Sequence, residues 1–280
     1  MEKEQYDLMF AQEERHWWYI GMRRISAALL EQFPPLSTLQ DRSGNGSASG
    51  SGTGRPLDIL DAGCGSGGMT RYLSTFGRVT GIDFAPEALA LSQQRGLPRL
   101  ARASVGEIPF RDGSFDVVTS FDVLYHLNVD DDRAAISEIH RVLKPGGIAL
   151  IRLPAFDWIR GAHDEVVHTR HRYTRDELSG KLEDAGFRLE HATYANFLLF
   201  PLAPAKRYLE LRHVAHESTD LWRPPKPINR LLADLLSLEA LPARGLGLPW
   251  GLSVFAVARR VQALPAAQPP AQGVVGAATR

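Results

Sequence analysis

The stretch that decides the fold is Ile59-Leu60-Asp61-Ala62-Gly63-Cys64-Gly65-Ser66-Gly67-Gly68. Its apolar start predicts a buried strand, its glycines predict a tight turn, and the residues that follow predict a helix. Glycine has no Cβ, so the backbone of such a turn can come close to a ligand. The order of strand, glycine loop and helix is typical of nucleotide-binding α/β proteins.

On both sides of this stretch, short apolar strands alternate with helical runs. Strands are predicted at 57–62, 78–82, 100–103, 115–120, 148–153, 187–194 and 253–259, and helices at 3–33, 68–76, 86–95, 131–143 and 174–185. Asp130 or Asp131 is the predicted N-cap of the helix at 131–143, residues 144–147 are predicted to end that helix, and Gly186 is the predicted C-cap of the helix at 174–185. The alternation predicts an α/β fold with a parallel sheet.

Composition excludes several classes of protein. The 280 residues include 32 Lys and Arg against 32 Asp and Glu, so the formal net charge is zero. This balance argues against a general nucleic-acid binder, and the average composition argues against disordered and collagen-like chains. Cys64 has no partner for an internal disulfide, residues 1–5 lack the apolar core of a signal peptide, and no apolar run is long enough to span a bilayer. We therefore expect a cytoplasmic protein.

The chain divides into segments that differ in composition and hydrophobic pattern. The predicted organisation is an N-terminal helical arm at 1–40, a flexible Gly/Ser linker at 41–56, a core at 57–196, a helical insertion at 197–250, the last core strand at 251–261 and a disordered tail at 262–280. The folded body is therefore predicted to be smaller than the full length.

Two acidic residues identify the class of ligand at the glycine loop. Asp83 follows Gly63 by 20 positions and ends the next predicted strand, where a carboxylate can accept hydrogen bonds from ribose hydroxyls. Asp61 stands directly before the glycines, where it would repel a pyrophosphate but could pair with an ammonium group. This argues against a dinucleotide and for S-adenosylmethionine, whose methionine part carries an ammonium.

At this point the sequence resembles the class I S-adenosylmethionine-dependent methyltransferases, specifically the small-molecule type 11 group. The resemblance rests on five stretches in order, at 60–67, 81–83, 108–118, 123–127 and 141–147. It implies a Rossmann-like seven-stranded sheet with S-adenosyl-L-methionine as cofactor. It also implies a set of cofactor-binding residues: Asp61, Gly63 and Gly65 at the methionine part, Asp83 at the ribose, Phe84, Ser104 and Val105 around the adenine, and Phe121 between cofactor and acceptor. The family commonly has an acidic residue at the position of Ser104, so this sequence departs from the family pattern at the adenine.

Residues 13–24 and 161–174 resemble segments of bacterial methyltransferases of saccharide, lipid-linked and secondary-metabolite pathways. The predicted acceptor-binding residues are Trp18, Tyr19, Arg23, Tyr125, Arg172 and Tyr173. Packing of the aromatics in the core is the competing interpretation, and surface ion pairs are the alternative for Arg23 and Arg24.

Three histidines are candidates for a general base, namely His126, His163 and His168. Neutral imidazole can accept a proton near pH 7. For the His- and Arg-rich loop that contains His163 and His168, a metal site and a structural hydrogen-bond network are the alternatives, and a metal is not expected. Cys64 is interpreted as a small residue packed in the turn.

The sequence thus predicts transfer of a methyl group from S-adenosylmethionine to O or N of a small molecule or a saccharide- or lipid-linked intermediate. The alternatives are a cofactor-bound protein with a non-methylating reaction, such as a cyclisation, and a non-catalytic partner subunit. The expected partner is a small-molecule acceptor and not a nucleic acid. The insertion at 197–250 is interpreted as a lid, a homodimer interface or a peripheral membrane contact.

Overall fold

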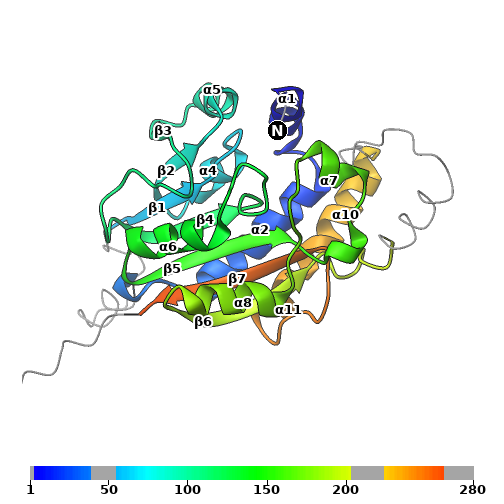
Figure 1. The fold of residues 1–280 in the computed structure, drawn as a ribbon. Coiled ribbons are helices and arrows are strands. Elements are labelled where there is room, and N and C mark those ends of the chain that lie inside the picture. The colour runs from blue at the N-terminus through cyan, green and yellow to red at the C-terminus, as the bar shows by residue number, and fades with distance from the viewer. Residues whose placement is uncertain (1–2, 39–54, 203–223, 262–280) are drawn as a thin grey trace, which may run out of the picture.

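The structure is a computed structural model that describes residues 3–38, 55–202 and 224–261 (Figure 1). Its centre is a seven-stranded sheet in the order β3-β2-β1-β4-β5-β7-β6. Only β7 runs antiparallel to its neighbours. Residues 41–54 of the predicted linker at 41–56 and the predicted tail at 262–280 lie outside the described residues.

The strands follow the apolar runs of the sequence closely. They are β1 (Leu57–Ala62), β2 (Gly77–Asp83), β3 (Leu100–Arg102), β4 (Phe115–Phe121), β5 (Leu143–Pro154), β6 (Phe187–Ala195) and β7 (Ser253–Arg260). All seven residues of β4 are buried, as expected for a central parallel strand that is covered on both faces. The predicted seven-stranded α/β sheet is confirmed.

The helices of the core cover both faces of the sheet. They are α4 (Gly68–Leu73), α5 (Pro86–Gln94), α6 (Asp132–Val142) and α8 (Arg175–Asp184). In Figure 1, α6 and α8 lie on the near face of the sheet, and α2 (Trp17–Gln32) crosses behind it. The side chain of Asp131, not Asp130, caps α6 by accepting a hydrogen bond from the N–H of Arg133 at 2.8 Å.

The predicted element ends differ from the structure in detail. Residues 144–147 were predicted to end the helix at 131–143; α6 ends at Val142, β5 begins at Leu143, and residues 144–147 lie within this strand. Gly146 has a φ of 79°, and the register with β4 shifts between Phe115 and Val117, so the strand takes up the glycines as an irregularity. The C-cap of α8 is Ala185, and Gly186 follows it with a φ of 89°.

The N-terminal arm is two helices rather than the single predicted one. The helix α1 (Lys3–Gln12) ends before Glu13, and α2 begins after His16, whose side chain accepts a hydrogen bond from the N–H of Trp18 at 3.3 Å. Asn229 also caps α2, because its Oδ1 accepts from the N–H of Trp17 at 3.0 Å. The break turns the arm back across the sheet edge, so that α1 lies near α5 (Figure 1).

The C-terminal insertion contains α10 (Lys226–Leu238) and α11 (Ala240–Arg244), and both helices pack against α2. Two short elements follow β5, namely the 3-10 helix η1 (Asp157–Ile159) and α7 (Ala162–Val166). No helix among the described residues is long and apolar enough to cross a membrane.

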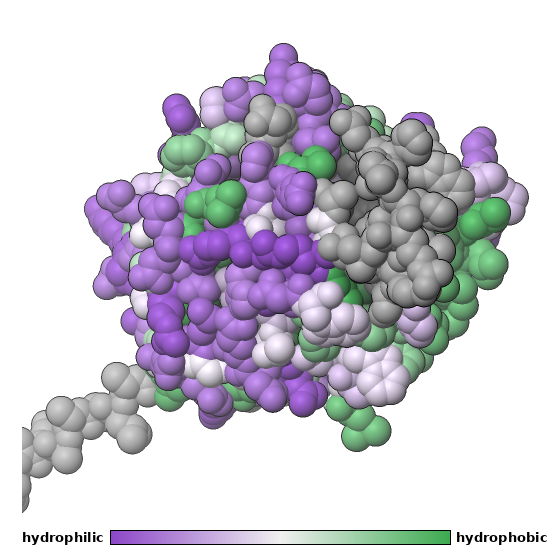
Figure 2. All heavy atoms as spheres, turned by 45° about the vertical axis from the view of Figure 1, so that its right-hand side comes forward, coloured by the Kyte–Doolittle hydropathy of each residue, from purple (hydrophilic) through white to green (hydrophobic). Residues whose placement is uncertain are grey.

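Exposed apolar side chains remain on the insertion, among them Ile228, Leu231, Leu238 and Leu241. In Figure 2 hydrophobic residues gather along the right-hand side of a mainly hydrophilic face. The lid, dimer interface and membrane contact all stay predictions, since residues 203–223 lie outside the described part of the chain.

Candidate functional site

A cavity of about 850 Å³ lies at the carboxyl edge of the sheet. Ligands bind at this edge in open α/β sheets, and the volume lies in the upper part of the range for small-molecule sites. Two parts of the wall differ in character. The glycine-loop end consists of Asp61, Gly63, Gly65, Asp83, Phe84, Ser104 and Val105, and the aromatic end consists of Trp18, Tyr19, Phe121, Asp122, Tyr125 and Arg152.

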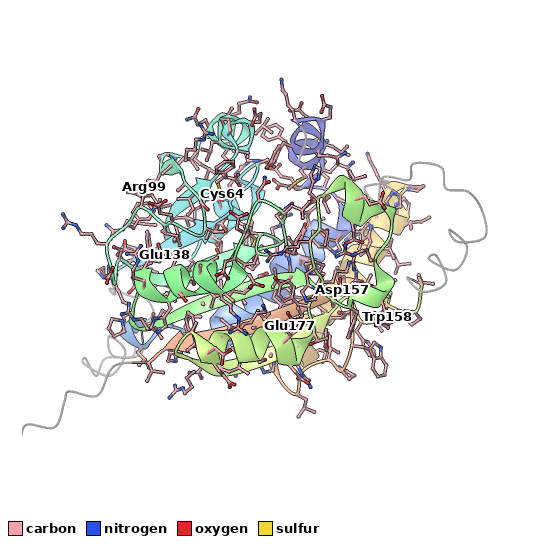
Figure 3. The ribbon with its side chains drawn as sticks, viewed as in Figure 1. Cys64, Arg99, Glu138, Asp157, Trp158 and Glu177 are labelled. Atoms are coloured by element: carbon pink, nitrogen blue, oxygen red, sulfur yellow. The ribbon has the colours of Figure 1, made fainter. Side chains whose placement is uncertain are left out.

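The glycine loop is held in a conformation that glycine favours. The φ angles are 87° at Gly63, 54° at Gly65 and 83° at Gly67. A Cβ at Gly63 would lie 2.2 Å from Cγ2 of Val123. The glycines therefore serve both the turn and the close approach of the loop to the segment after β4. Cys64 is buried in this turn, as predicted, and burial raises the pKa of its thiol (Figure 3).

Asp61 is a buried carboxylate at the floor of the glycine-loop end. Its Oδ2 accepts a hydrogen bond from the hydroxyl of Thr70 at 2.6 Å, and its Oδ1 accepts one from Thr119 at 2.9 Å. Burial outweighs these hydrogen bonds and raises the pKa of Asp61 to about 6. A cation next to this carboxylate would favour its charged form.

Asp83 holds the two loops of this end together. Its Oδ2 accepts from the N–H of Gly65 and its Oδ1 accepts from the N–H of Ala85, both at 2.9 Å. Burial raises its pKa from the ordinary value. The neighbouring Phe84 lines the cavity with a side chain that is 58% exposed, an arrangement suited to stacking on a flat ring.

The other predicted cofactor-binding residues also line the cavity. Ser104 accepts a hydrogen bond from the N–H of Gly106 at 3.1 Å, and Val105 is buried beside it. Phe121 ends β4 and lies with its ring 5.0 Å from the guanidinium of Arg152. All eight predicted positions therefore surround one cavity.

The predicted acceptor residues divide into those at the cavity and one away from it. Trp18, Tyr19, Arg23, Tyr125 and Arg172 line the cavity. Trp18 also packs against the hydrophobic core, so both interpretations of this aromatic apply. The residue away from the cavity is Tyr173. Arg24, which is not a predicted acceptor residue, forms an exposed ion pair with Asp234 at 3.5 Å.

Tyr173 is a correction to the predicted site. Its side chain is only 1% exposed and does not line the cavity, and its hydroxyl donates a hydrogen bond to Oδ2 of Asp132 at 2.6 Å. The residue fixes the loop after β5 to the N-terminus of α6, and burial is the main reason that its pKa is raised.

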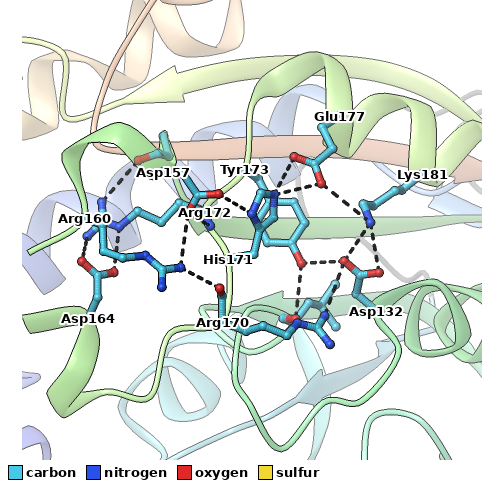
Figure 4. Close-up of polar contacts among 12 residues, drawn as sticks. Asp132, Asp157, Arg160, Asp164, Arg170, His171, Arg172, Tyr173, Glu177 and Lys181 are labelled. Carbon is cyan, nitrogen blue, oxygen red and sulfur yellow. Dashed lines mark hydrogen bonds and ion pairs between the residues drawn. The ribbon is translucent and has the colours of Figure 1, made fainter.

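The polar loop around Tyr173 is a network of ion pairs (Figure 4). Arg172 donates from Nε and Nη2 to the two carboxylate oxygens of Asp164, at 2.7 and 3.0 Å. His171 lies between Asp157 and Glu177, with Nε2 2.8 Å from Oε2 of Glu177. Within the described residues, no three His, Cys, Asp or Glu side chains converge as a metal site would require.

The three candidate histidines have different positions. His126 lines the cavity, with its ring stacked at 4.5 Å on Tyr125, and burial lowers its pKa to about 4. It is therefore neutral at pH 7 but a weak base. His168 is outside the cavity lining, which is a correction, because its left-handed backbone with a φ of 54° belongs to the turn after α7. His163 lies in α7, and its side chain is outside the described part of the chain.

Several cavity residues were not predicted from the sequence. Glu13 reaches from the arm to the glycine loop, where its Oε2 accepts from the N–H of Gly68 at 2.9 Å. Arg152 and Asp122 form an ion pair at the ends of β5 and β4. A signal existed for Arg152, because it is a charged residue within the apolar run 148–153. No comparable signal marked Glu13 among the many charges of the arm.

Comparisons with known proteins agree with this geometry. Residues 60–151 match a family model described as a methyltransferase domain. A probable S-adenosylmethionine-dependent methyltransferase of Mycolicibacterium smegmatis is 37% identical over 139 residues, which are 48% of this chain and 52% of the relative. Residues 60–151 are therefore similar to a methyltransferase domain.

Other relatives of this methyltransferase domain have different acceptors in their names. A malonyl-[acyl-carrier protein] O-methyltransferase of Enterobacter lignolyticus is 32% identical over 142 residues, which are 48% of this chain and 55% of the relative. The chain spans about half the length of these curated relatives.

A solved complex of the Haloferax volcanii Trm112 methyltransferase activator with a putative methyltransferase shares the fold of the methyltransferase domain. The match has a TM-score of 0.56 at 18% identity and covers 92% of this chain and 98% of the solved one. Family and fold together imply S-adenosyl-L-methionine as the cofactor.

Proposed function

We propose that the protein transfers the methyl group of S-adenosylmethionine to an oxygen or nitrogen atom of a small molecule, or of a saccharide- or lipid-linked intermediate. The observation that carries this proposal is the pair of carboxylates, buried Asp61 and half-buried Asp83, on either side of a glycine loop in one cavity wall. Asp61 could pair with the cationic amino-acid part of a ligand, and Asp83 could accept hydrogen bonds from its ribose.

The residues of the glycine-loop end fit the cofactor in three respects. The carboxylate of Asp61 favours a ligand with positive charge, as the ammonium of the cofactor provides. The Asp83 carboxylate can accept from two ribose hydroxyls, and the exposed ring of Phe84 can stack on the adenine. When bound, the sulfonium supplies an already activated methyl group, so the chain has mainly to align the acceptor.

The aromatic end is the proposed acceptor site. It lies at the carboxyl ends of β4 and β5, and further apolar side chains line the same cavity, among them Ile159, Leu199 and Leu202. The mixture of aromatic, apolar and paired polar groups supports a small organic acceptor rather than a nucleic acid.

The test is the affinity for S-adenosylhomocysteine, measured by calorimetry. Replacing Asp83 by alanine removes two charged hydrogen bonds to the ribose, and we expect an affinity at least about 100-fold lower. Asp184→Asn, which removes an exposed carboxylate paired with Arg133, is the matched control and should bind normally. Normal binding by Asp83→Ala would contradict the proposed cofactor site.

A further inference from the structure

Asp122 lies where β4 leaves the sheet, directly after Phe121. Its φ is 57°, a left-handed backbone conformation that is uncommon for residues other than glycine. The N–H of Asp122 donates to the carbonyl of Arg152 at 2.9 Å, which fixes this conformation. Asp122 lines the cavity at its aromatic end. Strain of this kind is frequently found at functional positions.

Arg152 orients the carboxylate and leaves one oxygen available. Its Nε and Nη2 both donate to Oδ2 of Asp122, the former at 3.0 Å. Within the described residues, Oδ1 of Asp122 has no hydrogen-bond partner. The guanidinium is in turn held between the rings of Trp18 at 4.8 Å and Phe121 at 5.0 Å. One carboxylate oxygen is thus fixed while the other remains free to accept a hydrogen bond.

A purely structural ion pair would explain this arrangement less well. The side chain of Arg152 is 8% exposed, and the desolvation of such a cation offsets most of what an ion pair contributes to stability. An apolar residue would suit the apolar strand β5 better. Because burying this ion pair costs desolvation free energy without adding much stability, we infer that the pair has a functional role at the cavity.

The charges at the aromatic end indicate the class of acceptor. Arg152 neutralises Asp122, and Arg172 neutralises Asp164 through two hydrogen bonds. The remaining polar groups include the amide of Asn196, which is 2% exposed and whose buried Oδ1 has no partner among the described residues. A neutral acceptor with hydroxyl groups satisfies these groups without leaving a buried charge unpaired.

We propose that Asp122 is the general base of the reaction and that its substrate is a hydroxyl group on a neutral acceptor, with Arg152 as the positioning residue. This inference rests on the proposed function. The O–H bond of the acceptor breaks, and the proton moves to Oδ1 of Asp122. The oxygen lone pair forms the bond to the methyl carbon while the carbon–sulfur bond breaks, and its electron pair stays on sulfur.

The carboxylate is basic enough because the hydroxyl becomes a stronger acid as its oxygen forms the new bond. His126 is the competing base, since it lines the same cavity. It is less well placed, because its ring lies flat on Tyr125 and its backbone is bridged to Thr169 in the loop.

The experiment compares two acceptors, one that has a hydroxyl proton to remove and one that has already lost it. Phenol and 4-nitrophenol are offered with methyl-labelled S-adenosylmethionine at an alkaline pH at which only 4-nitrophenol is ionised. For phenol, Asp122→Asn should lower kcat about 100-fold or more with little change in KM, which is the usual contribution of a general base. For the nitrophenolate, which has no proton to remove, the loss should stay within about threefold.

Control measurements separate this inference from the proposed function. Asp122→Asn should bind S-adenosylhomocysteine like the wild type and unfold at a similar temperature, because asparagine tolerates the left-handed backbone well. Asp184→Asn, far from the cavity lining, should keep full activity on both phenols.

Three outcomes would overturn the assignment. Equal losses on both phenols would show a structural role for Asp122, and a selective loss on phenol in His126→Asn but not in Asp122→Asn would identify the histidine as the base. Transfer to neither phenol by a wild type that binds S-adenosylhomocysteine would exclude the hydroxyl acceptor while leaving the cofactor site intact. If the wild type bound no S-adenosylhomocysteine, the proposed function itself would fail.

Discussion

The glycine-loop end and the aromatic end of the cavity are built in different ways. At the glycine-loop end, most of the wall comes from one continuous stretch, 61–105, to which the arm adds Glu13, and backbone N–H groups of the loops hold the carboxylate of Asp83. At the aromatic end, long side chains arrive from the arm, from β4 and its loop, and from β5. A wall made mainly by one local segment suits a ligand that is the same in all members of a fold. Where the wall comes from several segments, its residues can be substituted for a different ligand without disturbing the fold.

Gly63 lies where the two ends meet, so its replacement should affect both. In Gly63→Ala the new Cβ would overlap Val123, the neighbour of Asp122, and alanine would have to adopt a φ of 87°. The strained backbone costs about 1–2 kcal/mol and the overlap about 1–3 kcal/mol, so we expect a loss of about 4 kcal/mol in the free energy of unfolding. Urea denaturation measures this loss.

A matched control is Gly96→Ala, which has a similar φ of 77° but no atom within 4 Å of the new Cβ. Its free energy of unfolding should fall only by the cost of the strained backbone, about 1–2 kcal/mol. Equal losses in the two variants would mean that the contact with Val123 does not join the two ends.

The different construction of the two ends also explains what the sequence predicted. The strands and the glycine-loop end follow from local patterns, so the sequence predicted that Asp61 and Asp83 lie together at the glycine loop, and both line the cavity. The ion pair of Asp122 and Arg152 joins residues 30 positions apart, and Asp122 lines the cavity with a left-handed backbone angle that no composition reveals. Tyr173 was misplaced for a similar reason, since its partner Asp132 lies on another element.

The arm connects the two ends, and Arg95 is the residue that fastens it. Arg95, with its side chain 5% exposed, donates to the carbonyls of Ser66 at 2.6 Å and Phe10 at 2.9 Å and pairs with Glu13 at 3.0 Å. Because Glu13 belongs to the glycine-loop wall and Trp18 to the aromatic wall, loosening the arm should weaken both.

In Arg95→Met we expect S-adenosylhomocysteine to bind about 10- to 30-fold more weakly, which corresponds to about 2 kcal/mol for lost hydrogen bonds to charged groups. Calorimetry measures the affinity, and limited proteolysis near residues 13–16 should become faster. Arg71→Met, which removes an exposed ion pair with Glu14, should change neither result. An unchanged affinity in Arg95→Met would show that the arm is not part of the cofactor wall.

Replacement of Asp61 is expected to have the smallest effect on the free energy of unfolding at pH 7. At this position a charged carboxylate favours ligand binding but destabilises the folded protein. Because burial raises the pKa of this carboxyl from 3.8 to about 6, the folded state binds a proton that the unfolded state has already released. The stability contributed by this proton is present below about pH 4 and is lost as the pH rises through about 6, a change of about 3 kcal/mol.

Asp61→Asn should remove this pH dependence. At pH 7 the variant should be about 1 kcal/mol more stable than the wild type, because relief from burying a charge exceeds the cost of poorer hydrogen bonds to Thr70 and Thr119. Its affinity for S-adenosylhomocysteine should nevertheless fall, since the ammonium loses its carboxylate. In the wild type this affinity should also decrease as the pH falls below about 6, where Asp61 takes up its proton. Two results would contradict this role of Asp61. One is that Asp61→Asn is less stable than the wild type at pH 7. The other is that its free energy of unfolding depends on pH between 4 and 6 as strongly as that of the wild type.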